Sequence, residues 1–228
     1  MAKASAIDKN TINARPTKRL VAFVLTKDIS LEDAILDLVD NSVDGARKAA
    51  GSAGLSKYQV DIEFTSNSFR ISDNCGGMSI ELAKNYAFRF GRPEEYAPLD
   101  DTTRTIGNFG VGMKRAILKM GRAINIASRT KSEFFSIDIN VDTWLADDES
   151  VDAWTFKFST QGETTSKPED IGTTIEVRNL YQGVSERLKL EGFQTDVELL
   201  IRNKQSESLS AGMLILVNGT PIQAPEIY

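Results

Sequence analysis

The chain has 228 residues, of which 41% are hydrophobic and 26% are charged, a composition typical of a globular protein and not of a disordered one. It has no histidine, one cysteine and a net charge of −5; these exclude a Ser-His-Asp triad, a histidine-ligated metal, a disulfide framework and a broad nucleic-acid-binding surface. Because no apolar run approaches the ~20 residues of a membrane helix and the N-terminus lacks a signal-peptide pattern, we expect a cytoplasmic protein.

The first elements in the chain are an arm and a long helix. Residues 1–16 should form a flexible arm, and the pattern of residues 17–26 does not decide between helix and strand. Ser30 followed by Asp33 is typical of a helix start, and the helix should continue to Gly51, which can end it. Its core-facing residues should be those at helical spacing: Leu36, Val39, Val43 and Ala46.

The remaining elements predict an α/β protein. Alternating apolar and polar residues on both sides of Ser66-Asn67 predict a hairpin over residues 58–73. The other expected elements are a helical segment 79–88, a long loop 90–109, a helix 111–120, strands 123–128, 133–140, 155–159 and 172–178, an acidic connection 145–150, a helix 196–206 and a strand 213–217. Helices interspersed among hairpin-joined strands favour a two-layer α/β sandwich with a mixed sheet.

The first long helix carries a polar stripe. Asp37, Asn41 and Asp44 are four and three residues apart, so they share one side of the helix, and Asp33 extends the stripe by one turn. Carboxylate and amide oxygens in such a row can bind a hard cation or orient water. Taken alone, the stripe is also what a solvated helix face shows.

Two glycine-bearing segments follow. Asp73 is expected at the end of a strand, where its carboxylate could accept from an exocyclic amine while Gly76 and Gly77 let the backbone approach a flat ligand. Alone, this segment also fits an ordinary turn. Farther along, Gly107, Gly110 and Gly112 run into a predicted helix, whose first amides can bind an anion.

Charge supports an anion site at the second segment. Between Thr102 and Ser132 there is no acidic residue, whereas seven residues are basic: Arg104, Lys114, Arg115, Lys119, Arg122, Arg129 and Lys131. In a chain of net negative charge this asymmetry suits a polyphosphate, although a basic outer helix face would give the same pattern.

In their order and spacing, these segments and the later Gly172-Thr173 strand start resemble the gyrase, heat-shock chaperone, histidine kinase and MutL (GHKL) ATPases with the Bergerat fold. The resemblance spans about residues 30–178, and its most specific part is Asp-Leu-Val-Asp-Asn-Ser-Val-Asp-Gly-Ala at 37–46. The long interval between Asp73 and Gly107 is more similar to the chaperone, MutL and microrchidia branch. The resemblance to this superfamily implies a mixed, largely antiparallel sheet with helices on one face.

The resemblance also implies ATP and Mg²⁺ as ligands, and roles for individual residues. Asn41 matches the asparagine that ligates magnesium, and Asp37 matches the residue that activates the attacking water. Asp73 matches the aspartate that binds the adenine amine, with Thr173 as its helper through water. The other implied nucleotide contacts are Asp44, Gly77, Met78, Gly107, Asn108, Phe109, Gly110, Val111, Gly112, Met113 and Lys114.

The sequence departs from the family pattern at two positions. Many relatives have glutamate where this chain has Asp37, which is shorter by about 1.5 Å, and a misplacement of ~1 Å can lower a rate ~100-fold. Cys75 stands where the adenine segment usually has its first glycine. Hydrolysis is therefore expected to be slow in isolation.

Three functions remain open from the sequence. The first is an ATP-hydrolysing, Mg²⁺-dependent conformational and dimerisation switch, the second a nucleotide-sensing module with negligible turnover, and the third a protein kinase domain of the histidine-kinase type. The resemblance implies one ATP-binding domain at 17–228, with a lid at about 89–113, as the N-terminal part of a longer protein. ATP-dependent self-association is implied, and DNA or a protein client could bind through regions outside this chain; no membrane partner is expected.

Overall fold

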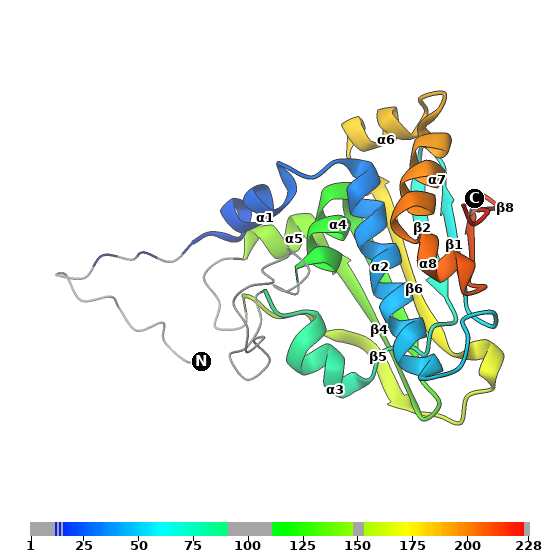
Figure 1. The fold of residues 1–228 in the computed structure, drawn as a ribbon. Helices are drawn as coiled ribbons and strands as arrows, with labels where there is room; N and C mark the ends of the chain where they lie inside the picture. The colour runs from blue at the N-terminus through cyan, green and yellow to red at the C-terminus, as the bar shows by residue number, and fades with distance from the viewer. Residues whose placement is uncertain (1–11, 13, 15, 91–110, 148–152, 226–228) are drawn as a thin grey trace.

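The computed structural model describes residues 12, 14, 16–90, 111–147 and 153–225, which form two layers, a sheet and a set of helices (Figure 1). Most of the expected arm at 1–16 and of the loop at 90–109 lies outside the described residues. Among the described residues, no helix is both long and apolar enough to cross a membrane.

The sheet is mixed and mostly antiparallel. Its eight described strands lie in the order β5-β4-β3-β6-β2-β1-β7-β8, and among them only the pair β1–β7 is parallel. The strands are β1 (Gln59–Phe64), β2 (Ser68–Asp73), β3 (Gly121–Arg129), β4 (Glu133–Asn140), β5 (Phe158–Glu163), β6 (Gly172–Leu180), β7 (Leu214–Val217) and β8 (Thr220–Pro221). The register pairs Asp73 with Thr173, so two sequence-predicted site residues lie on neighbouring strands.

The helices pack beside and in front of this sheet, with α2 between α4 and α7 (Figure 1). They are α1 (Lys18–Thr26), α2 (Leu31–Ala50), α3 (Ile80–Leu82), the π-helical η1 (Ala83–Ala87), α4 (Gly112–Met120), α5 (Val141–Ala146), the 3₁₀ turn η5 (Pro168–Asp170), α6 (Gln182–Leu188), α7 (Phe193–Lys204) and α8 (Ser206–Ser210). This architecture is the predicted α/β two-layer sandwich.

The core lies between α2 and the sheet. Ser30 caps α2 by accepting from the Asp33 amide, and Gly51 ends it with a positive φ, as the sequence predicted. Val39, Val43 and Ala46 are buried, whereas Leu36 is only partly buried against the core. Alternate residues of the strands complete the core: Val60, Ile62, Phe69, Ile71, Ile124, Ile126, Ile175 and Val177.

Several predicted elements differ from those observed. The undecided segment 17–26 is helical, and three short helices, α5, α6 and α8, were not predicted. The helix α5 includes the start of the expected connection at 145–150, and the helix expected at 196–206 is α7, which begins at Phe193 and ends at Lys204. The strand predicted at 155–159 is present as β5, but it begins later, at Phe158, and continues to Glu163. Phe156 instead packs in an aromatic cluster with Trp144, Phe88 and Phe90.

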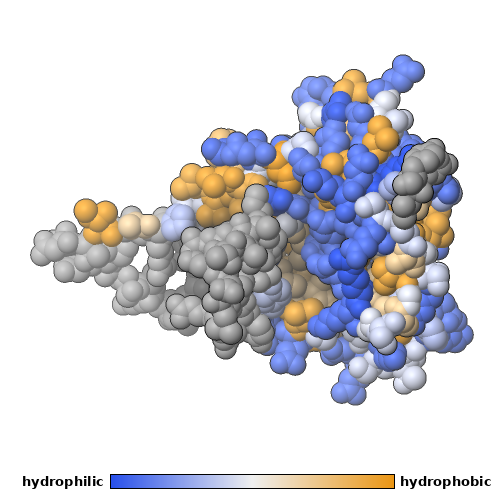
Figure 2. Space-filling view, in the orientation of Figure 1, coloured by the Kyte–Doolittle hydropathy of each residue, from blue (hydrophilic) through white to orange (hydrophobic). Residues whose placement is uncertain are grey.

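The outer surface is polar over much of the helical layer, while apolar residues gather in the region of α1 (Figure 2). Leu20, Phe23 and Val24 of α1 are all more than half exposed, at spacings of three and four residues. This apolar stripe faces outward and lies apart from the main core.

Candidate functional site

A cavity of about 660 Å³ lies between α2, the loop after β2, the α3–η1 segment and the start of α4. These elements can be followed in Figure 1. Its lining contains eight of the sequence-predicted residues: Asn41, Asp44, Asp73, Gly77, Met78, Gly112, Met113 and Thr173. Segments far apart in the sequence therefore converge on one hollow.

Asp73 is the most strongly positioned side chain of this cavity. Its Oδ1 accepts from the Cys75 amide at 2.8 Å and from the Thr173 amide at 3.3 Å, while its Oδ2 accepts from Ser42 Oγ at 2.7 Å. Burial raises the pKa of Asp73, and the three hydrogen bonds oppose that rise. An ionised carboxylate has about four acceptor sites, so about one remains for a hydrogen-bond donor in the cavity.

Ser128, at the end of β3, connects Thr173 beside Asp73 to the loop after β2. Its Oγ accepts from the Met78 amide at 2.7 Å and shares a hydrogen bond of 2.9 Å with Thr173 Oγ1. The Thr173 side chain is thus held in the same network as the Asp73 carboxylate. This network fixes the distance between the loop after β2 and the ends of β2 and β6, which form the floor of the cavity.

Two glycines permit the close backbone approaches in this region. Gly77 has φ +69°, and a Cβ there would lie 2.0 Å from the Arg129 carbonyl oxygen. Gly172 has φ +152°, and a Cβ there would lie 1.7 Å from the Asp73 carbonyl oxygen. A side chain at either position would push apart the strands and loop that form the floor.

Asn41 and Asp44 are exposed on the side of α2 that faces the cavity. Within the described parts of the chain, no group of three or more acidic or cysteine side chains could hold a metal ion by itself. Mg²⁺ bound with a nucleotide takes only one or two protein oxygens and leaves the other positions to phosphate and water. The amide of Asn41 and the carboxylate of Asp44 fit that donor set.

Asp37 has a different environment. Arg115 donates through Nε to Asp37 Oδ2 at 2.5 Å and through a terminal nitrogen to Oδ1 at 2.8 Å. The Asp37 side chain is 18% exposed and the Arg115 side chain 16%. Asp37 does not line the cavity, whereas Asn41 does. The structure therefore does not bring these two predicted residues together in the site.

Lys114 also lies away from the cavity lining. It is buried on α4, and its Nζ donates to the Ala87 carbonyl at 2.7 Å, across to the end of η1. Burial lowers the pKa of Lys114 to about 8. In this arrangement the lysine connects two walls of the cavity and does not project into it.

The glycine-rich segment is described only in part. Gly107, Asn108, Phe109 and Gly110 lie outside the described residues, whereas Val111 is the residue before α4, and the helix begins at Gly112. Because the first amides of a helix lack partners within it, the nine-residue helix α4 presents donors beside the cavity. Such an end can bind an anion.

Sequence reasoning missed several residues of this region: Ser42, Lys48 and Tyr86, which line the cavity, Ser128, and Arg115. Ser42 could have been found from its place in the most specific motif. Ser128 and Arg115 act through contacts that are distant in the sequence, and no local pattern signals them.

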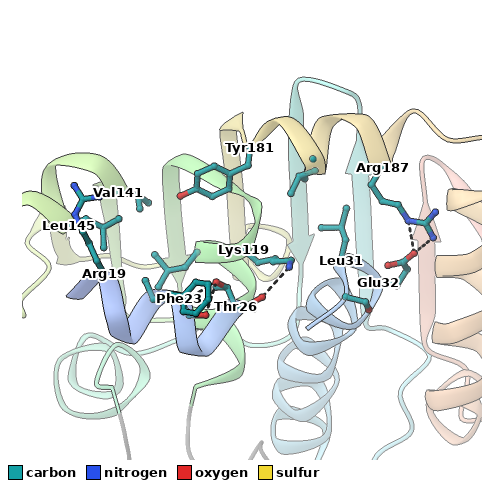
Figure 3. A pocket seen from close by; sticks show the side chains of 15 residues that line it. Arg19, Phe23, Thr26, Leu31, Glu32, Lys119, Val141, Leu145, Tyr181 and Arg187 are labelled. Atoms are coloured by element: carbon teal, nitrogen blue, oxygen red, sulfur yellow. Dashed lines mark hydrogen bonds and ion pairs between the residues drawn. The ribbon is translucent and has the colours of Figure 1, made fainter. Parts of the chain in front are cut away.

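A second cavity, of about 710 Å³, lies between α1, the start of α2, the end of α4, α5 and α6 (Figure 3). Lys119 Nζ donates to the Thr26 carbonyl at 3.0 Å on one side, and Arg187 pairs with Glu32 on the other. None of the sequence-predicted site residues lines it. A third cavity, of about 720 Å³, is lined by Asp73 but by none of the other sequence-predicted site residues. The cavity that Asp73 shares with Asn41 and Thr173 is therefore the candidate site, and it is called the Asp73 cavity below.

The chain was compared with known protein families and solved structures. The family model described as "Histidine kinase-, DNA gyrase B-, and HSP90-like ATPase" matches residues 29–173. The solved structure of the Aquifex aeolicus MutL ATPase domain complexed with ADP is 16% identical, with a TM-score of 0.47, and the match covers 86% of this chain. The chain spans 65% of the length of that structure. No curated protein matches significantly.

Proposed function

Since the chain belongs to the histidine kinase-, DNA gyrase B- and HSP90-like ATPases, we propose that it binds ATP with Mg²⁺ in the Asp73 cavity and hydrolyses it. The observation that carries this proposal is the Asp73 carboxylate, held by three hydrogen bonds with an acceptor site left over. That site suits the exocyclic amine of adenine. Guanine has a carbonyl oxygen at that ring position, which would meet the carboxylate as acceptor against acceptor.

The phosphates would extend from Asp73 toward Asn41 and the first turn of α4. The amides at the start of α4 favour negative charge, and Lys48 on the α2 side of the cavity adds a cation. Asn41, with Asp44 beside it, would hold Mg²⁺, which neutralises phosphate charge when it is bound. The paired ends of β2 and β6, at Asp73 and Thr173, would keep the base in a fixed position relative to these groups.

In the proposed reaction a water molecule attacks the γ-phosphorus. The new bond joins the water oxygen to phosphorus, the bond from phosphorus to the β–γ bridging oxygen breaks, and ADP and inorganic phosphate are released. Asp37 accepts a proton from the water as general base. For this role the Asp37 carboxylate must leave its present position beside Arg115 and reach the cavity.

Residues 17–228 would form one ATP-binding domain, and ATP binding would promote self-association in a Mg²⁺-dependent switch. One observation favours a second candidate, a nucleotide-sensing module with negligible turnover. Both oxygens of Asp37 accept from Arg115, so the resting carboxylate is poorly placed to activate water.

Two measurements test the proposed function. In a thermal-shift assay with ATP, ADP and GTP, each with and without Mg²⁺, ATP at ~100 times its dissociation constant should stabilise the protein by ~2.7 kcal/mol, and GTP should have little effect. Phosphate release is then compared between wild type, Asp37→Asn and Asn41→Ala. Tight ATP binding without phosphate release over hours would favour the sensor, and equal release from all three proteins would refute the assigned roles.

A further inference from the structure

The ion pair between Asp37 and Arg115 joins α2 to α4 beside the candidate site. It is bidentate, with both guanidinium–carboxylate hydrogen bonds at 2.8 Å or less. Both side chains are mostly buried, so solvent screens the pair less than it screens the exposed pairs of this protein. Bidentate Arg–carboxylate pairs fix the orientation of the carboxylate as well as its position.

The pair holds Asp37 behind the cavity wall. Gly112 lines the cavity, and a methyl group added at Gly112 would lie 3.5 Å from Asp37 Cγ. The carboxylate therefore lies next to the cavity wall without being part of it. Its position can change only if Arg115 gives up at least one of the two hydrogen bonds.

Arg115 has a second carboxylate within electrostatic reach. Asp33 lies one turn before Asp37 on α2, is exposed, and accepts from Ser30 Oγ at 2.7 Å. Hydrogen bonding to Asp37 is the main cause that raises the pKa of Arg115, and the charges of Asp37 and Asp33 also contribute. The charges of two carboxylates one helical turn apart thus both act on the guanidinium, and Asp33 offers it an alternative partner.

Arg115 belongs to the first turn of α4, the turn whose start borders the cavity. A triphosphate bound at this helix end would contact the same turn that carries the guanidinium. We propose that Arg115 is a positioning residue that withholds Asp37 from the cavity in the resting protein and releases it when Arg115 moves toward Asp33. This inference rests on the proposed function, because it assigns to Asp37 the part of general base.

Steady-state hydrolysis tests the proposal. Arg115→Gln should raise kcat by about three- to tenfold with little change in KM, because Asp37 no longer has to leave an ion pair. Arg115→Lys keeps the charge but loses the two-pronged geometry, and its kcat should lie between wild type and Arg115→Gln. The matched control is Arg70→Gln, which removes an exposed pair with Glu63 outside the site and should leave kcat unchanged. A kcat of Arg115→Gln at or below wild type would overturn the proposal.

A second measurement does not depend on turnover. Melting temperatures of Asp37→Asn, Arg115→Gln and the double variant form a double-mutant cycle. Without nucleotide the two single substitutions should be non-additive; with Mg²⁺ and a non-hydrolysable ATP analogue this coupling should fall by at least half. Undiminished coupling would refute the release of Asp37, even if ATP is hydrolysed. If the analogue stabilises every variant but none releases phosphate, the hydrolysis in the proposed function fails while the loss of coupling still supports the release. If no nucleotide binds, both fail.

Discussion

Asp73→Asn is the substitution that most directly examines the base-binding end of the site. An asparagine side chain has nearly the same shape, and its carbonyl oxygen can still accept from the amides of Cys75 and Thr173. The Ser42 hydroxyl, which is also 3.5 Å from the Leu38 carbonyl, can turn to accept from the new amide nitrogen. The fold should therefore survive.

The expected loss is in ligand binding. A hydrogen bond to a charged acceptor contributes about 1.5–3 kcal/mol, so ATP should bind Asp73→Asn roughly 10- to 150-fold more weakly. The new NH₂ group would also meet the adenine amine as donor against donor. Isothermal titration calorimetry with a non-hydrolysable ATP analogue measures this change. Asp61→Asn is the matched control, since it removes the same charge from β1 without lining this cavity.

The same variant has a pH signature. Burial raises the pKa of Asp73 above 3.8 in the folded protein, so the folded state holds this proton to higher pH than the unfolded state. Wild type should therefore lose stability relative to Asp73→Asn as pH rises from 3.8 through the raised pKa, and the difference should be constant above it. Unchanged affinity, or an equal loss in Asp61→Asn, would refute the assignment of Asp73 to the base.

Three further predictions concern other parts of the site. Asn41→Ala should lose most of the Mg²⁺-dependent part of the ATP thermal shift and keep the Mg²⁺-independent part; equal losses of both would contradict its place beside the metal. Gly77→Ala should destabilise the protein by more than the about 1–3 kcal/mol that its φ of +69° alone would cost, because the new methyl group would also lie 2.0 Å from the Arg129 carbonyl oxygen. Urea unfolding should show Gly183→Ala, a change into open space, to be neutral or stabilising. Lys114 has a folded-state pKa of about 8, below its unfolded value of 10.5. Wild type should therefore gain stability relative to Lys114→Met as the pH rises from 8 to 10.5. A difference in melting temperature that does not change with pH would contradict the burial of this ammonium group.

Local signals explain which elements could be predicted from the sequence. The boundaries of α2 follow from the Ser30 cap and from Gly51, and the β1–β2 hairpin follows from its alternation, because both are decided within a few neighbouring residues. The start of β5 could not be predicted in this way. Phe156 fits a strand by its local pattern, but its ring packs against Trp144 and Phe88, and only the folded core decides that.

In the candidate site, too, local motifs could be read from the sequence and long-range contacts could not. Asn41, Asp73 and Gly77 belong to motifs with a chemical reason for their spacing, and all three line one cavity. The partner of Asp37 could not be predicted, because Arg115 is 78 residues away in the sequence and nothing near either residue indicates the pair. Motifs therefore identified the residues of the cavity, whereas tertiary contacts decide which of them face it in this state.

The single parallel pair of strands has a consequence for biosynthesis. β1 lies between β2 and β7, and its partner in β7, residues 214–217, leaves the ribosome about 150 residues later. Until then the β1 edge of this hairpin is open, and the carbonyls of Tyr58 and Ile62, which accept from the Leu214 and Asn218 amides in the folded protein, have no partner there. A nascent chain, or a truncated one that stops before Leu214, would carry this edge as a template for pairing with other chains, so the last strands close the sheet against aggregation.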